Sequence, residues 1–286
     1  MRPYLELLRP GNVATALADV LAGVAVTGLA HPAALPWLLA STVWLYGGGV
    51  VLNDVFDRHI DARERPERPL PSGRASVRRA AWLGAVLLVA GIGFASRVSD
   101  TAAAVAALIA LSVLCYDAWG KRQMFIGPVN MGLCRGLNLV LGMASAPETI
   151  RHSWWLGLIA VTYIAAVTMV SRGEVAGGKR PVALAATGLV GAALAALAWV
   201  TARQAGWQTV AWLYLAVLAW RVLPPFLRTA GDPSPMTIRV AVRTGVLSLV
   251  LVNAVIAAAY AGMIYSLAVV ATALLAGWLA RRFAVT

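Results

Sequence analysis

The chain has 286 residues, of which 60% are hydrophobic and only 13% are charged. Soluble domains carry about 25% charged residues, so this composition excludes an ordinary soluble protein and predicts an integral membrane protein. The formal net charge is +12, yet the basic residues do not alternate with aromatic ones as they do in a nucleic-acid-binding groove. We therefore expect no nucleic-acid partner and attribute the charge to membrane topology and contact with anionic lipid.

Ten apolar segments are long enough to cross a bilayer, since a spanning helix needs about 20 residues. In chain order they cover residues 12–30, 35–52, 79–96, 101–118, 126–145, 153–171, 182–202, 206–223, 240–260 and 262–282. The sequence therefore predicts an all-α polytopic membrane protein with nine to ten transmembrane helices. The first apolar segment lacks a convincing cleavage site, so we expect a retained helix and a single domain over residues 1–286.

The basic residues follow one side of this topology. If the N-terminus is cytoplasmic, every Lys and Arg is cytoplasmic except Arg97, Arg151 and Arg203 on the opposite side and Arg135 within a helix. This bias agrees with the positive-inside rule and predicts that both termini are cytoplasmic. The same rule places three polar loops on the cytoplasmic side, at about residues 53–78, 116–125 and 171–181.

The first of these loops opens with three aspartates. Asp54, Asp57 and Asp61 are separated by three and four residues, which places them on one helix face with their carboxylates able to converge. A hard divalent cation prefers such oxygen ligands. Three prolines and a glycine in residues 65–74 then predict a structured turn. The alternative is a solvated loop that only enforces topology, but such a loop needs no aspartates in phase.

Short motifs along most of the chain resemble those of the UbiA superfamily of intramembrane prenyltransferases. Residues 9–12 are similar to its Arg-Pro-x-Asn motif, and residues 53–61 match Asn-Asp-x-x-Asp-x-x-x-Asp. Residues 68–73 match the Arg-Pro-x-Pro-Ser-Gly segment that follows. Tyr116 with the basic pair that follows it resembles the family's Tyr and Lys-Arg motif, with one residue more of spacing. The resemblance implies a UbiA-like bundle around a central cavity that is open to the cytoplasmic side and the bilayer.

Two features depart from the family pattern. The second acidic motif usually reads Asp-x-x-Asp-x-x-Gly-Asp, whereas the corresponding residues here are Ser171, Glu174, Gly177 and Gly178. Only one carboxylate remains, which puts a second Mg²⁺ in doubt. Four apolar segments follow this motif, where the family commonly has three. Together with residues 135–138, these features resemble the divergent UbiA-like branch of the Ebo operon, and we expect a bacterial inner membrane protein.

What the resemblance implies is Mg²⁺-dependent transfer of a prenyl group from an isoprenoid diphosphate to an aromatic or other lipophilic acceptor. The implied catalytic residues are Asn53, Asp54, Asp57 and Asp61. The implied metal ligands are Asp54, Asp57, Asp61 and Glu174. The implied contacts to the diphosphate are Asn12, Arg58, Arg68, Tyr116, Lys121, Arg122, Arg135, Asn138, Arg172 and Lys179. In place of a second metal ion, we expect Arg172 and Lys179 to meet the diphosphate directly through charge-assisted hydrogen bonds.

The reduced second motif leaves another interpretation open, namely a non-catalytic isoprenoid-binding or transport-related protein. CDP-alcohol phosphotransferases also have clustered intramembrane aspartates, but Asp57-Arg58-His59 does not supply the Gly and Ala-Arg of their motif. A secondary transporter would show paired broken helices or inverted repeats, and no internal duplication is clear. Asp19 and Arg135 lie within expected helices, where ionisable groups form either a functional site or a structural pair.

Overall fold

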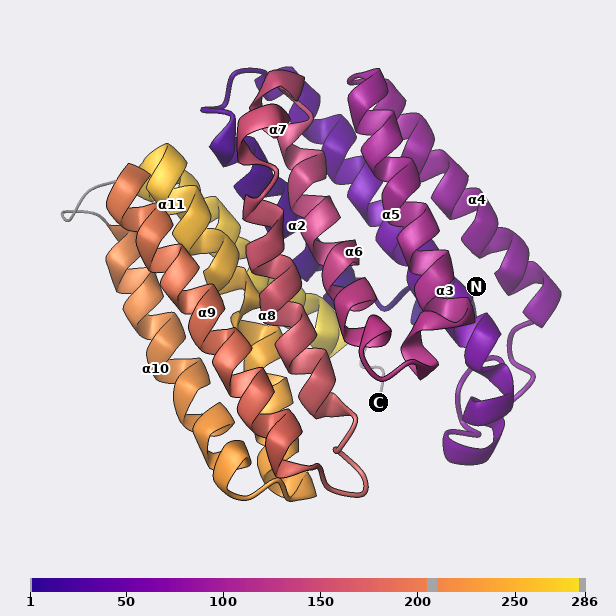
Figure 1. The fold of residues 1–286 in the computed structure, drawn as a ribbon. Coiled ribbons are helices and arrows are strands. Elements are labelled where there is room, and N and C mark those ends of the chain that lie inside the picture. The colour runs from indigo at the N-terminus through magenta and orange to yellow at the C-terminus, as the bar shows by residue number, and fades with distance from the viewer. Residues whose placement is uncertain (1, 205–209, 283–286) are drawn as a thin grey trace.

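The computed structural model describes residues 2–204 and 210–282, and every regular element in this part of the chain is a helix. The α-helices are α1 (Arg2–Leu8), α2 (Pro10–Val26), α3 (Leu35–Glu64), α4 (Val77–Ser96), α5 (Asp100–Ala118), α6 (Ile126–Met143), α7 (Pro147–Ser153), α8 (Leu156–Ser171), α9 (Arg180–Gln204), α10 (Val210–Gly231) and α11 (Pro235–Arg282). Two short 3₁₀ helices, η1 (Pro32–Ala34) and η2 (Gly120–Arg122), join them. The long helices run side by side in one bundle (Figure 1).

Length and composition identify the membrane-crossing helices. Six of the described helices are long and apolar enough to cross a membrane, and the pair α7 and α8, bent by 63°, raises the number to seven. Large apolar side chains such as Trp82, Val89 and Trp220 are exposed on the outside of the bundle, where lipid suits them better than water. The all-α membrane fold is therefore confirmed. A total of nine to ten spans stays a prediction, and residues 206–209 of one expected span lie outside the described residues.

Small residues let α2 and α6 approach closely near the C-terminal ends of both helices. A Cβ atom on Gly23 of α2 would lie 2.0 Å from the carbonyl oxygen of Leu139, and one on Gly142 of α6 would lie 2.3 Å from that of Val20. Neither position has room for a side chain. In a membrane, where apolar side chains gain little from leaving lipid, such close backbone contact is a main source of helix association.

The long helix α11 is two helices joined at Gly262. Its φ of 78° and ψ of −174° are not helical, and this region of conformational space is open to glycine. The expected segments 240–260 and 262–282 therefore lie on separate halves of α11. The chain reverses here, and Val269 of the second half packs with Ala18 of α2 while the Tyr265 hydroxyl donates to the Leu21 carbonyl at 3.0 Å.

The loops predicted to be cytoplasmic lie at one end of the bundle (Figure 1). Arg172, just after α8, donates a hydrogen bond of 2.8 Å to the carbonyl oxygen of Lys121 in η2. The backbone N–H of Gly178 donates to the Pro233 carbonyl, also at 2.8 Å, which connects the loop before α9 with the loop before α11. The polar ends of α5 and α8 are therefore neighbours, as the sequence predicts.

Candidate active site

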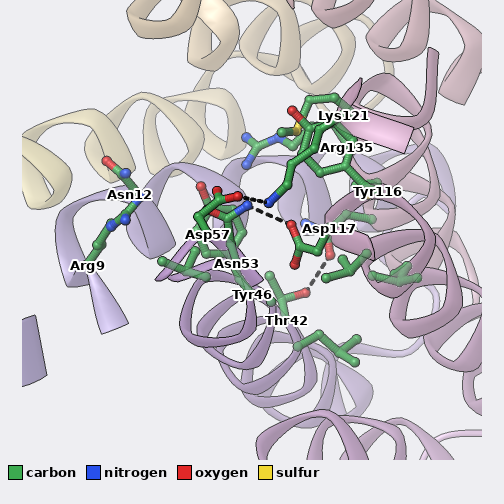
Figure 2. Close-up of a pocket in the computed structure, with 18 residues that line it drawn as sticks. Arg9, Asn12, Thr42, Tyr46, Asn53, Asp57, Tyr116, Asp117, Lys121 and Arg135 are labelled. Atoms are coloured by element: carbon green, nitrogen blue, oxygen red, sulfur yellow. Dashed lines mark hydrogen bonds and ion pairs between the residues drawn. The ribbon is translucent and has the colours of Figure 1, made fainter. Parts of the chain in front are cut away.

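A cavity of ≈ 390 Å³ lies between α2, α3, α5 and α6 and is lined by residues from these helices and from η2 (Figure 2). Polar and charged side chains include Arg9, Asn12, Asn53, Asp57, Asp117 and Lys121. Apolar side chains include Leu45, Val50, Ile109, Val113 and Met131. Arg9, Asn53, Asp57 and Lys121 also line an adjoining hollow of ≈ 360 Å³ with Asp61, Arg68 and Arg122. The charged groups thus gather where the cavity meets the loop end of the bundle.

The aspartate motif occupies the last turns of α3, and arginines pair with two of its carboxylates. Asp54 and Asp61 are buried. The Arg68 guanidinium lies 2.7 Å from Asp61 and 3.5 Å from Asp54, and Arg9 forms a second ion pair with Asp54. The expectation that Asp54, Asp57 and Asp61 converge on one point is not met. No three His, Cys, Asp or Glu residues in the described ranges are grouped to hold a metal ion, and each of the three carboxylates is paired with Arg or Lys.

The remaining aspartate of the motif faces the cavity. Asp57 lies 2.6 Å from the ammonium group of Lys121, which η2 brings across from the end of α5. Beside this pair, the Asn53 side-chain amide donates a hydrogen bond of 2.7 Å to Asp117 of α5. These two contacts join the first acidic motif to the segment after the fourth expected helix (Figure 2). Tyr116 lines the cavity next to them. The predicted proximity of these two loops is therefore correct.

A buried polar network lies beside the cavity at the level of the α2–α6 crossing. Asp19 is 0% exposed and lies 3.0 Å from Arg135 Nε. Asn138 and Asn253 donate hydrogen bonds of 3.1 and 2.7 Å to its carboxylate. Asn138 also accepts one of 2.8 Å from Thr42. Arg135 and Asn138 do line the cavity, but their side chains are held by Asp19, so the structure realises the structural pair that the sequence left open.

The segment after α8 turns away from the central cavity. Arg172 donates to the carbonyl oxygens of Lys121 and Gln123, and no residue of 171–181 lines the cavity or the adjoining hollow. Arg172 and Lys179 instead line a separate cavity of ≈ 550 Å³. Arg172 is bonded to backbone carbonyls, and the contact of Arg172 and Lys179 with a diphosphate stays a prediction.

Two further predicted residues also lie apart from the cavity. The Glu174 backbone carbonyl accepts a hydrogen bond of 3.0 Å from Arg239. Partial burial raises the pKa of the Glu174 carboxyl above its usual range, and the nearby Arg239 and Arg65 oppose this shift. Arg58 is exposed on α3 and donates to the Val55 carbonyl at 3.2 Å. Neither residue lines the central cavity or the adjoining hollow, and the roles of Glu174 as a ligand and of Arg58 as a diphosphate contact stay predictions.

The structure adds residues that the sequence did not assign to the site. Arg9, between α1 and α2, has a left-handed φ of 44°, and its side chain lines the cavity and pairs with Asp54. A positive φ at a non-glycine residue costs conformational energy and is often found at functional sites. Asp117, Thr42 and Tyr46 also line the cavity. The Arg-Pro-x-Asn resemblance pointed to Arg9, and Asp117 stands beside the predicted Tyr116. Tyr46 is one of the aromatic side chains that could stabilise an allylic cation through the π-face, but no pattern marked Thr42.

Comparison with known proteins gives a clear family. The model of the UbiA prenyltransferase family matches residues 13–222. A digeranylgeranylglyceryl phosphate synthase from Methanothrix thermoacetophila is 37% identical over 149 residues, which are 51% of this chain and 56% of that protein. The match thus spans little more than half of the relative's length. The narrower resemblance to the Ebo-operon branch stays a prediction.

Solved structures show the same fold at low sequence identity. A structure described as a digeranylgeranylglyceryl phosphate synthase in membranes has a TM-score of 0.71 and 17% identity, covering 91% of this chain and 98% of its own. A UbiA homologue from Archaeoglobus fulgidus, described as bound to DMAPP and Mg²⁺, has a TM-score of 0.61 and 17% identity, with 88% and 98% covered. At this identity the likeness establishes the fold alone.

Proposed function

Since this chain belongs to the UbiA prenyltransferase family, we propose that it transfers a prenyl group from an isoprenoid diphosphate to a lipophilic acceptor within the membrane. One observation carries the proposal. The central cavity combines a charged mouth, with Arg9, Lys121 and Asp57, and an apolar interior between α3, α5 and α6. A diphosphate head and an isoprenoid tail need these two environments in one place.

The basic side chains at the mouth bind the diphosphate in this proposal. Arg68 and Arg122 line the hollow that adjoins the cavity, and Arg9 and Lys121 line both spaces. Arginine can contact two phosphate oxygens at once, and lysine acts as a compact charge. In the free protein Arg9, Arg68 and Lys121 are paired with Asp54, Asp61 and Asp57, respectively. Binding of the diphosphate therefore exchanges some of these ion pairs for contacts with phosphate.

The oxygen atoms at the mouth suit Mg²⁺, because the carboxylate of Asp57 and the amide oxygen of Asn53 are hard donors that reach the cavity. Asp54 and Asp61 would join them once Arg9 and Arg68 turn to the diphosphate. When bound, Mg²⁺ would neutralise the charge that grows on the diphosphate as the allylic C–O bond breaks. Asn53 also keeps α3 and α5 together at this point through its hydrogen bond to Asp117.

The apolar wall of the cavity protects the reacting carbon from water. Leu45 and Val50 on α3 face Ile109 and Val113 on α5 across the cavity, with Met131 on α6. An isoprenoid chain along this wall would leave no room for water, which would otherwise capture the allylic cation. Tyr46 lines the same space and lies under Arg135, whose guanidinium carbon is 6.0 Å from the ring centre.

The name of the curated relative bears on the acceptor. A digeranylgeranylglyceryl phosphate synthase makes a product in which two prenyl chains are carried by glyceryl phosphate. We therefore place a prenylated glyceryl phosphate first among acceptors for this chain and an aromatic ring second. The charged mouth lies on the side that the positive-inside rule assigns to the cytoplasm, so we also propose that both substrates enter from the cytoplasmic side of a bacterial inner membrane.

The non-catalytic alternative also rests on a specific observation. Asp54 and Asp61 are paired with arginines, and residues 171–181 contribute nothing to the cavity. A protein that binds an isoprenoid diphosphate without turnover needs no more than the basic side chains at the mouth. The two functions differ in one measurable result, the release of inorganic diphosphate together with a prenylated product.

The test uses the full chain in lipid nanodiscs with Mg²⁺ and geranyl, farnesyl or geranylgeranyl diphosphate. Geranylgeranylglyceryl phosphate and a panel of aromatic acceptors are supplied, and mass spectrometry detects the product. We expect transfer by the natural chain and a loss of about 100-fold in kcat/KM for Asp57→Asn, as for removal of one group that stabilises developing charge. Asp100→Asn, at the far end of α5, should retain activity. Binding without transfer to any acceptor would establish the non-catalytic alternative.

A further inference from the structure

Asp117 differs from the other carboxylates at the mouth of the cavity. Asp54, Asp57 and Asp61 each form an ion pair with Arg or Lys. Asp117 has no ion pair within the described part of the chain, and its only hydrogen-bond partner there is the neutral amide of Asn53. Its second oxygen, Oδ2, is buried and has no hydrogen-bond partner. This carboxylate therefore has an unused ligand atom in a cavity that it lines.

The surroundings of Asp117 make its negative charge costly. The side chain is only 2% exposed, and a buried charge whose one hydrogen-bond partner is a neutral amide loses hydration that is only partly replaced. Asp117 also lies in the last turn of α5, which contains no basic residue. The negative end of the helix dipole disfavours an anion at this position. The burial of the side chain, its unpaired Oδ2 and its place at the helix end all favour a cation beside Asp117.

Asp117 lies where it can supply a carboxylate that the second acidic motif of this chain no longer has. The segment in which the family carries its second acidic motif keeps only Glu174, and that segment lines neither the cavity nor the adjoining hollow. Asp117 stands on α5, across the cavity from Asp57 on α3, with Asn53 and Lys121 between them (Figure 2). A cation at this point would be held from both helices.

We propose that Asp117 and Asp57 together hold the divalent cation that accompanies the diphosphate, and that Asp117 replaces a carboxylate missing from residues 171–178. The site takes a hard cation such as Mg²⁺ or Mn²⁺, since its donors are carboxylate oxygens. When the cation binds, Lys121 leaves Asp57 and turns to the diphosphate. The inference rests on the proposed function for the identity of the diphosphate, but the metal site can be measured without any transfer reaction.

The experiment measures binding of Mn²⁺ to the full chain in nanodiscs, with and without inorganic pyrophosphate, by electron paramagnetic resonance of the free ion. We expect Asp117→Asn to raise the Mn²⁺ concentration at half-saturation by at least about 10-fold, the order of effect seen when metal-site groups are removed. Asp117→Glu should recover part of the affinity because it keeps the charge. Asp100→Asn on the same helix is the matched control and should bind Mn²⁺ like the natural chain.

The outcomes separate this inference from the proposed function. Unchanged Mn²⁺ binding by Asp117→Asn, with the melting temperature preserved, overturns the inference even if prenyl transfer is observed. If transfer is lost but Mn²⁺ binding is unchanged, Asp117 acts on the acceptor and the inference is again overturned. Weaker Mn²⁺ binding by Asp117→Asn supports the inference even when the natural chain transfers no prenyl group. The absence of transfer refutes only the proposed function.

Discussion

The buried carboxylate of Asp19 offers the sharpest test of what stabilises this bundle. Its Oδ1 accepts from Asn253 and from Arg135 Nη2 at 2.7 and 3.3 Å, and its Oδ2 accepts from Asn138 at 3.1 Å and lies 3.0 Å from Arg135 Nε. Both oxygens thus face N–H groups. In Asp19→Asn the new amide places its own N–H groups against two donors in either orientation, so no rotation of the side chain relieves the conflict.

The expected loss of stability follows from these contacts. The loss of two donor contacts within a membrane protein, at about 0.6 kcal/mol each, gives a lower limit of about 1 kcal/mol. The variant also leaves the Arg135 guanidinium buried without its counter-charge, a change that costs about 3–5 kcal/mol where it has been measured in proteins. We therefore expect Asp19→Asn to lower the free energy of unfolding by about 1–5 kcal/mol.

The assay is reversible unfolding in detergent and SDS mixtures, followed by circular dichroism. Asp19→Leu combined with Arg135→Met removes both charges, and it should recover more than half of the loss that Asp19→Leu causes alone. Glu148→Gln, an exposed carboxylate at the start of α7, is the control and should cost less than about 1 kcal/mol. A loss below about 1 kcal/mol for Asp19→Asn would refute the reasoning.

Two further predictions concern the segment after α8. Arg172→Ala removes the two hydrogen bonds that hold the η2 backbone. We therefore expect KM for the isoprenoid diphosphate to rise about fivefold to tenfold with kcat nearly unchanged, and Arg172→Lys to recover part of the lost affinity. An unchanged KM in steady-state assays would contradict this role of Arg172. The raised pKa of Glu174 means that its ionisation destabilises the fold. Glu174→Gln should therefore have a higher melting temperature than the natural chain at pH 7. The difference in melting temperature should vanish below about pH 4.3, the ordinary pKa of Glu. A difference that widens in acid would contradict the prediction.

Most helices of the bundle could be predicted from the sequence, because each membrane span must form its backbone hydrogen bonds within one apolar segment. All ten expected segments overlap described helices, and the boundary between the last two falls at Gly262. The bend between α7 and α8 was not predicted, since the residues from Pro147 onward carry no mark of a 63° change in direction. Helix existence is a local property, whereas helix direction depends on packing.

The sequence predicted which residues lie at the site better than it predicted which of them contact one another. Topology alone places the end of α3 next to the segment after α5, and the Asp57–Lys121 pair confirms it. Helical spacing could not reveal that Arg9 and Arg68 pair with Asp54 and Asp61. These pairs join residues far apart in the chain or across a proline-rich turn. Arg172 shows the same limit: its side of the membrane was predictable, but the carbonyl groups it binds were not.

The reversal at Gly262 has a consequence for the order in which this protein can be assembled. The second half of α11 covers α2, where Val269 meets Ala18 and Tyr265 bonds to Leu21. Helix α2 follows directly on Arg9 and carries Asn12 of the cavity. A chain emerging from the ribosome N-terminus first must therefore hold its first long helix in lipid, uncovered on this face, until the last helix has been inserted. The first helix to enter the membrane is thus the last to be enclosed.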